Sequence, residues 1–214
     1  MKVLFLDFDG VLNSWQEAHY HHRLSKTPLL RFRSFLYWLY YKGDKLYPKK
    51  IKRWLRWEMF FWLSNHCDFC PIACNNLQLL LEVEPELRIV VSSTWRLNGM
   101  KIVRRVLKRN GIDVSRFIGI TGTEGSVADG RNSTHLDGAP RGEEIQRWLY
   151  DNQDKNVTHI VIVDDDSDMA HLKEFHVKTS TEEGFMFKKM ERAKEILQVP
   201  YKLGMKFDPE NPIV

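Results

Sequence analysis

Two aspartates stand two positions apart directly after an apolar stretch near the start of the chain. Residues 2–13 read K-V-L-F-L-D-F-D-G-V-L-N, a pattern typical of a buried parallel strand that runs into Asp7 and Asp9. Side chains two apart on a strand point the same way, so both carboxylates can face one pocket, and Gly10 permits a tight turn after them. Two carboxylates this close repel each other unless a cation lies between them or one holds a proton. All-oxygen ligation favours magnesium.

The four residues Asp-x-Asp-Gly are also common in exposed turns. The short motif therefore does not separate a metal-dependent reaction centre from a solvated strand end. The longer string D-x-D-G-V-L after an apolar strand is more specific. It predicts a reaction centre if other strands end in matching polar groups.

Polar clusters follow two later apolar segments in the same way. After residues 87–91 and 159–163 the clusters are Ser92-Ser93-Thr94 and Asp164-Asp165. Ligands of open α/β sheets bind at the carboxyl ends of the strands. We therefore expect one site that contains all three clusters, with Arg141 entering it from the start of a helix that precedes the third strand.

The elements that position these side chains alternate between strand and helix along the chain. Such alternation predicts an α/β fold, a Rossmann-like three-layer αβα sandwich around a parallel sheet with right-handed crossovers. Beyond the three strands above, the pattern predicts a strand over 117–120, an extended segment over 173–178, and helices from Leu77, over 101–108, over 141–150 and within 182–197. The Gly-, Thr- and Ser-rich residues 121–138 predict a long loop.

The composition changes abruptly over residues 14–76. This stretch holds eleven Lys or Arg against four Asp or Glu, whereas the whole chain carries a net charge of only +4, and it contains 15 of the 26 aromatic residues. Its periodicity is helical. We predict a basic, aromatic-rich helical cap over 14–76, inserted after the first strand into a core formed by 1–13 and 77–214.

One predicted helix of this insertion interleaves basic and aromatic side chains. It begins near Pro48 and carries Lys49, Lys50, Lys52, Arg53 and Arg56 among tryptophans and phenylalanines. Three interpretations remain open: the rings pack on neighbouring helices while the charges face water, the surface binds nucleic acid, or the helix lies on an anionic membrane.

Three cysteines lie within eight residues, at Cys67, Cys70 and Cys74. Their spacing includes a C-x2-C pair and allows a structural zinc site, but no second ligand pair accompanies it, and free cysteines also pack as small apolar residues. No disulfide framework is evident, and no apolar run approaches the roughly 20 residues that span a bilayer. We therefore expect a cytoplasmic protein.

Four strings of the sequence occur in the order of the motifs of the haloacid dehalogenase-like (HAD) phosphohydrolases, which this chain resembles. They are D-F-D-G-V-L, S-S-T-W-R, P-R-G-E-E-I-Q-R-W-L and V-I-V-D-D-D-S-D-M. With K-T-S-T-E-E-G-F near the end, the chain is most similar to small members associated with nucleic-acid and RNA repair. The resemblance covers nearly all of the chain outside 14–76 and implies a HAD-like fold with a cap at that place.

The resemblance implies a magnesium-dependent phosphoryl-transfer site. Asp7 would be the nucleophile that forms an aspartyl-phosphate, and Asp9 would protonate the leaving oxygen and later activate water. The Asp7 carboxylate, the Asp9 backbone carbonyl and Asp164 would bind the metal. Asp165 would bind it through waters, and Asp168 is a further candidate.

The other site residues would hold the substrate. Ser92 or Ser93, together with the fixed positive fork of Arg141, would bind the phosphoryl oxygens. Gly10, Thr94 and Arg96 are possible substrate contacts, although Arg96 has a purely structural role as its alternative.

The sequence thus predicts a hydrolase for phosphomonoesters, acting on an RNA or DNA end in the manner of a 3′-phosphatase or on a nucleotide. The alternative is a binding module, in which the HAD-like sheet is only a scaffold and the basic, aromatic insertion contacts nucleic acid or protein. The pair Asp7 and Asp9 favours the enzyme, because a scaffold gains nothing from paired acids.

Overall fold

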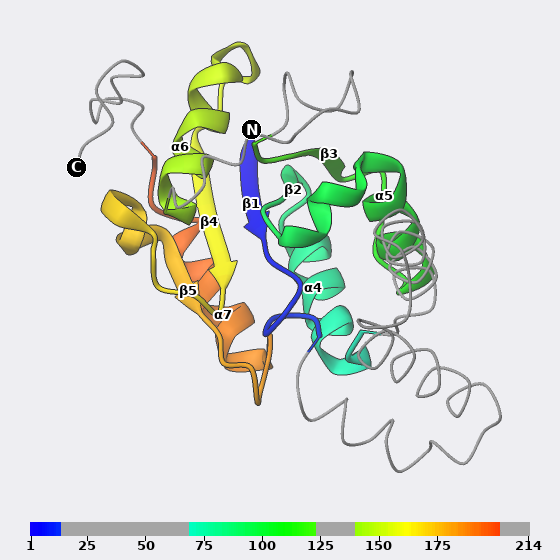
Figure 1. Ribbon diagram of the computed structural model, residues 1–214. Helices are drawn as coiled ribbons and strands as arrows, with labels where there is room; N and C mark the ends of the chain where they lie inside the picture. Colours follow the sequence, from blue (N-terminus) through cyan, green and yellow to red (C-terminus); the bar gives the residue numbers. More distant parts are fainter. Residues whose placement is uncertain (14–68, 123–139, 202–214) are drawn as a thin grey trace, which may run out of the picture.

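A computed structural model describes residues 1–13, 69–122 and 140–201 of the chain. These residues form a five-stranded sheet in the order β3-β2-β1-β4-β5, in which every neighbouring pair is parallel (Figure 1). The strands are β1 (Lys2–Leu6), β2 (Leu87–Val91), β3 (Phe117–Ile120), β4 (His159–Asp164) and β5 (His176–Lys178). The predicted α/β fold with a parallel sheet is confirmed.

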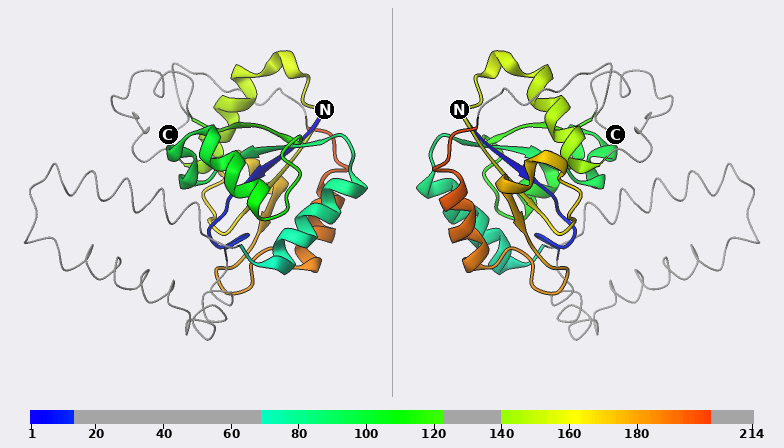
Figure 2. Two further views of the ribbon diagram at one scale, coloured as in Figure 1. Left: turned by 90° about the vertical axis from the view of Figure 1, so that its right-hand side faces the viewer. Right: turned by 90° about the vertical axis from the view of Figure 1, so that its left-hand side faces the viewer.

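Helices cover both faces of this sheet. Helices α4 (Pro71–Val83) and α7 (Phe187–Ile196) lie side by side on one face, and α6 (Arg141–Asp151) lies on the other (Figure 2). Helix α5 (Met100–Arg109) packs along β3. The short 3₁₀ helices are η2 (Thr94–Asn98), η3 (Gln153–Lys155) and η4 (Ala170–Phe175). The sheet is therefore the middle layer of a three-layer sandwich.

The central strands are apolar along their whole length because both of their faces are covered. Residues 3–6 of β1 and 160–163 of β4 are fully buried. On the α6 side, Phe5 meets Trp148 edge to face with 5.4 Å between the ring centroids. Burial of a side chain of this kind contributes about 1.5–3 kcal/mol. Because both faces of these strands are covered, side chains that point to either face are buried, and the apolar run is continuous rather than alternating.

The strand register brings the three polar clusters to one level. Leu6 pairs with Val91 of β2 and with Val163 of β4. The ladder continues one step further, because the Asp7 amide donates to the Val163 carbonyl at 3.0 Å. The residues that follow the three strands therefore start from the same edge of the sheet, the lower edge in Figure 1.

Helix α4 begins earlier than the sequence pattern indicated. Pro71 occupies its first turn, where the missing amide hydrogen costs nothing, and its buried residues recur every three or four positions. Phe69, Cys70, Ala73 and Cys74 belong to the hydrophobic core, so residues 69–76, which the predicted boundary assigned to the insertion, pack with the sheet. The division into core and cap remains a prediction. The predicted helices before residue 69 and the loop residues 123–138 lie outside the described residues.

The segment predicted as extended over 173–178 is extended only in its second half. Residues 170–175 form the 3₁₀ helix η4, and the strand β5 begins at His176. Leu172 and Phe175 are the buried residues of η4. Their spacing of three matches one 3₁₀ turn, which brings both side chains to the same side. Within the described ranges, no helix is both long enough and apolar enough to cross a bilayer.

Candidate active site

Three carboxylates meet where β1 and β4 end. The ligand oxygens of Asp7, Asp164 and Asp165 all lie within 4.8 Å of one another. Asp7 and Asp164 are buried, with 6% and 1% of their surface exposed, and Asp165 is partly exposed. In the part of the chain that the structure describes, this is the only group of three or more His, Cys, Asp or Glu side chains close enough to share an ion. We refer to these three residues as the acidic cluster.

The environment of the acidic cluster opposes its negative charge. Burial, followed by the neighbouring Asp164 carboxylate, raises the pKa of Asp7 to about 8, although Ser93 and Arg141 act in the opposite direction. Burial likewise raises the pKa of Asp164 to about 6. The pKa of Asp165 is also raised, mainly by burial and then by nearby carboxylates. A divalent cation would remove the repulsion that the protein alone leaves in place.

One oxygen of Asp164 is consistent with a cation in the acidic cluster. Its Oδ1 accepts a hydrogen bond from the Asp166 amide at 2.9 Å, but the buried Oδ2 accepts none, although the Nε of Arg141 lies 3.4 Å away. Buried carboxylate oxygens are normally satisfied by donors or metals. Three carboxylates form the all-oxygen donor set that Mg²⁺ prefers.

The turn after β1 is built so that Asp165 can approach. The amides of Leu12 and Asn13 donate to the Phe8 carbonyl at 2.9 and 2.8 Å, which closes the turn. Gly10 has a φ of +69°, and a Cβ there would overlap the Asp165 carboxylate. Only glycine adopts this backbone without strain. The backbone amide of Gly10 donates to the Asn13 carbonyl at 3.0 Å, so this amide stabilises the turn.

Asp9 stands next to the acidic cluster, with its carboxylate held by two donors. Trp95 Nε1 donates to Oδ2 at 2.9 Å, and Asn13 Nδ2 donates to Oδ1 at 3.0 Å. The side chain is exposed. Asp9 is thus oriented beside the buried carboxylates without being one of them, and the proposed metal contact through its carbonyl remains a prediction.

The two serines after β2 are buried but differ in their contacts. The Ser93 hydroxyl hydrogen-bonds the Asp7 carboxylate, which lowers the pKa of Asp7. Ser92 Oγ accepts a hydrogen bond from Thr121 Oγ1 at 3.4 Å. Of the two, Ser93 is therefore the one in contact with Asp7. Thr94 follows as the exposed first residue of η2.

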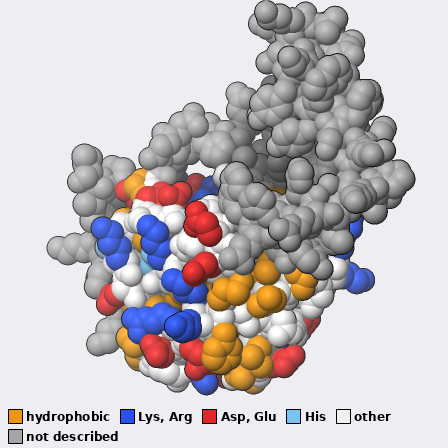
Figure 3. Space-filling view, turned by 90° about the horizontal axis from the view of Figure 1, so that it is seen from below, with side chains coloured by type: hydrophobic (Ala, Val, Ile, Leu, Met, Phe, Trp, Pro, Cys, Tyr) orange, Lys and Arg blue, Asp and Glu red, His pale blue; other side chains and the backbone are white. Residues whose placement is uncertain are grey.

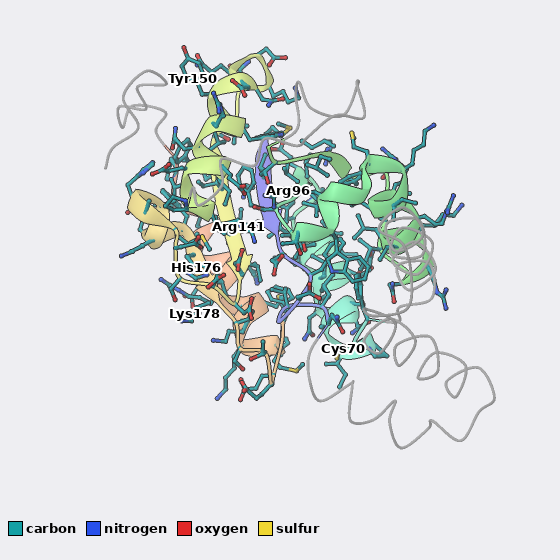
Figure 4. The ribbon with its side chains drawn as sticks, in the orientation of Figure 1. Cys70, Arg96, Arg141, Tyr150, His176 and Lys178 are labelled. Carbon is teal, nitrogen blue, oxygen red and sulfur yellow. The ribbon has the colours of Figure 1, made fainter. Side chains whose placement is uncertain are left out.

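Two arginines converge on Glu144 of α6. Arg96, which is 4% exposed, donates through Nη2 to both Glu144 oxygens at 2.6 and 2.8 Å. Arg141 Nη1 lies 3.5 Å from the same carboxylate while its Nε faces Asp164. Figure 4 shows the two arginines close together beside β1 and β4. Arg141 therefore borders the acidic cluster, and the burial of Arg96 favours its structural alternative.

The remaining predicted ligands lie away from the acidic cluster. Asp168 Oδ2 accepts a hydrogen bond from the Arg141 amide at 2.8 Å and so caps the start of α6. Cys70 and Cys74 are buried in the core, which agrees with the packing alternative. Cys67 lies outside the described residues, so the three-cysteine zinc site stays a prediction.

Sequence reasoning missed the partners of the charged site residues. It assigned no role to Trp95, Asn13 or Glu144. Asn13 stands four residues after Asp9 in a tight turn, a position from which an Asn side chain can reach back to the turn. The contacts of Trp95 and Glu144 span 86 and 48 residues of sequence, and no local pattern signals them.

The known proteins to which this chain is similar are HAD domains. The HAD domain of the effector protein Lem4 from Legionella pneumophila is a solved structure similar to this one, with 19% sequence identity, a TM-score of 0.45, and coverage of 92% of this chain and 94% of that chain. Among curated proteins, no sequence matches this chain. Residues 3–190 match the profile of a family described as the HAD domain in Swiss Army Knife RNA repair proteins. Since that match covers most of the chain, including the acidic cluster, the chain belongs to this family of HAD domains.

Proposed function

We propose that this protein is a magnesium-dependent phosphohydrolase that cleaves phosphomonoesters through an aspartyl-phosphate on Asp7. The acidic cluster carries the proposal. Burying mutually repelling carboxylates destabilises a fold, so a domain used only as a scaffold would not need them. The adjacent Asp9, held in a fixed orientation, supplies the second group that such a reaction requires.

The first half of the reaction moves the phosphoryl group to the protein. An Asp7 oxygen attacks phosphorus, and the bond between phosphorus and the leaving oxygen breaks. The leaving oxygen keeps the electron pair of that bond and takes a proton from Asp9. Ser93 and Arg141 are the groups best placed to hold the phosphoryl oxygens, because both already interact with Asp7.

The second half regenerates the enzyme. Asp9, now ionised, removes a proton from water while the water oxygen attacks phosphorus, and the bond between Asp7 and phosphorus breaks to release inorganic phosphate. Asp7, Asp164 and Asp165 would hold Mg²⁺, which supplies positive charge against the phosphoryl oxygens.

We further propose that the phosphate sits on a nucleic-acid end. The description of the family as a domain of RNA repair proteins supports this substrate class. The high content of Lys, Arg and aromatic residues in 14–76 supports it as well, because such side chains contact phosphates and stack on bases. The face seen from the carboxyl edge of the sheet carries Lys and Arg side chains interspersed with Asp and Glu, beside an apolar patch (Figure 3).

The central test is hydrolysis of p-nitrophenyl phosphate and of 3′- and 5′-phosphorylated oligonucleotides with Mg²⁺ and with EDTA. We expect turnover only with the metal. Asp7→Asn should lower kcat by a factor on the order of 10³ or more, since the nucleophile is lost. Asp151→Asn, an exposed acid at the end of α6, is the matched control and should retain full activity. Substantial turnover by Asp7→Asn would show that Asp7 is not the nucleophile.

The substrate class needs its own test. A phosphorylated oligonucleotide should have a lower KM than a mononucleotide, and that advantage should decrease steeply as salt increases, because phosphate contacts release counterions. Neutralising Lys49, Lys52 and Arg53 should raise the oligonucleotide KM and leave a small ester unaffected. Equal kinetics for both substrates across a salt titration would instead indicate a small-molecule phosphatase. Tight oligonucleotide binding without any hydrolysis would favour the binding module.

A further inference from the structure

Two side chains orient the Asp9 carboxylate, one 86 residues away in sequence and the other only four residues away. The indole of Trp95, at the start of η2, reaches Oδ2, and the amide of Asn13, at the end of the turn, reaches Oδ1. A carboxylate has about four acceptor sites. These two bonds use one site on each oxygen and fix the plane of the carboxylate, while further sites on the same oxygens can exchange a proton.

The Trp95 ring is itself held by two buried phenylalanines. Phe8 and Phe69 each lie 5.8 Å from it, centroid to centroid and edge to face, and they lie 5.0 Å from one another. Phe8 stands between the two aspartates of the first motif, and the next residue after Phe69, Cys70, donates its amide to the Leu12 carbonyl at 2.7 Å. The indole and the turn that carries Asp9 are therefore parts of one packed unit.

We propose that Trp95 is a positioning residue for Asp9, an inference that rests on the proposed phosphohydrolase function. An indole N–H is a donor only and does not titrate. It can therefore fix the carboxylate toward the leaving oxygen without competing for the proton that Asp9 gives and later recovers. A histidine or a hydroxyl at this place would offer an alternative route for that proton.

A positioning role and a merely structural role of Trp95 predict different kinetics. The parameter kcat/KM reports phosphoryl transfer to Asp7, in which the leaving oxygen takes a proton from Asp9. An alkoxide leaves poorly without that proton, whereas p-nitrophenolate leaves readily as an anion. Misplacing Asp9 should therefore slow the alkyl ester selectively, whereas a loss of folded structure should slow both esters equally.

The variant that separates the two roles is Trp95→Phe. It keeps an aromatic ring for packing against Phe8 and Phe69 but removes the N–H donor together with part of the indole. We expect kcat/KM for β-glycerol phosphate to decrease about tenfold, part of the 10²–10⁴ that general acid catalysis typically supplies, and kcat/KM for p-nitrophenyl phosphate to change less than about twofold. Asn13→Ala removes the other donor and should change the same ratio in the same direction.

Trp148→Phe is the control. It removes an indole from the α6 side of the sheet, where Trp148 packs on Phe5, and should leave the ratio of the two esters unchanged.

A spectroscopic measurement reports the contact without using activity. The indole N–H resonance of Trp95, assigned by its disappearance in Trp95→Phe, should shift in Asp9→Ala, whereas that of Trp148 should not. An unmoved Trp95 resonance would overturn the proposal. If the wild type is active, the proposal is also overturned when Trp95→Phe leaves kcat/KM unchanged for both esters or lowers it by the same factor for both. If the wild type hydrolyses neither ester, the proposed function fails and this role fails with it.

Discussion

Replacing Asp7 with Asn should stabilise the metal-free protein at neutral pH while it abolishes turnover. The reason is the pKa of Asp7, which burial and Asp164 raise from 3.8 to about 8. Below pH 4 the carboxyl holds its proton in both the folded and the unfolded protein, so it has no effect on the free energy of unfolding. Between pH 4 and pH 8 only the unfolded protein releases the proton, so stability decreases as pH rises.

The size of the effect follows from the same values. Each pH unit in that window lowers the free energy of unfolding by about 1.36 kcal/mol, which amounts to at most roughly 4 kcal/mol at pH 7 and roughly 1.6 kcal/mol at pH 5. Asn has the shape of Asp and carries no charge at any pH. For a chain of this length, 1 kcal/mol corresponds to about 2–4 °C in Tm, so the gain at pH 7 is on the order of 10 °C.

Thermal melts in EDTA at pH 5, 6, 7 and 8 measure this directly. We expect the Tm difference between Asp7→Asn and the wild type to grow with pH, and Mg²⁺ to raise the Tm of the wild type far more than that of the variant. Asp151→Asn serves as the exposed control and should follow the wild type throughout. A Tm difference that is the same at every pH, or a variant less stable than the wild type at pH 7, would refute the electrostatic account of the acidic cluster.

Two further substitutions test how the site is supported. Gly10→Ala should raise the Mg²⁺ concentration needed to stabilise the protein by about tenfold or more, because the new methyl group meets Asp165. Gly111→Ala is its control, because Gly111 has a similar φ of +78° and no neighbour within 4 Å of the new methyl group. It should lose a comparable 1–2 kcal/mol of stability to backbone strain and keep normal Mg²⁺ binding in the same melts. Arg96→Met should lower the free energy of unfolding by about 1–3 kcal/mol, because it leaves the partly buried Glu144 without its main partner. In urea denaturation the double variant Arg96→Met/Glu144→Gln should recover much of that loss, and strictly additive effects would contradict a coupled pair.

The central sheet and its acidic edge could be predicted from the sequence because local signals determine them. Apolar runs such as residues 3–6 and 160–163 have few alternatives to a strand covered on both faces. Once such strands pair in parallel, the residues that follow them share one edge of the sheet. The meeting of Asp7 with Asp164 and Asp165 therefore required only the order of the strands, not the detail of any side chain.

The surroundings of those carboxylates depend on tertiary structure. Whether Ser92 or Ser93 contacts Asp7 depends on how the chain turns into η2, and a shift of one residue reverses the answer. The early start of α4 and the 3₁₀ turn of η4 are set by what each segment packs against rather than by its propensity.

The partners of the charged side chains are likewise tertiary. Glu144 on α6 contacts Arg96 of η2, which stands 48 residues earlier, and Trp95 of η2 contacts Asp9 of the first turn, 86 residues earlier. Hydrogen bonds depend on tenths of an ångström and on the direction of the donor. Sequence periodicity specifies which face a residue occupies but not that geometry. The sequence therefore identified the carboxylates of the acidic cluster, whereas the packed fold decides how the polar side chains around them are oriented.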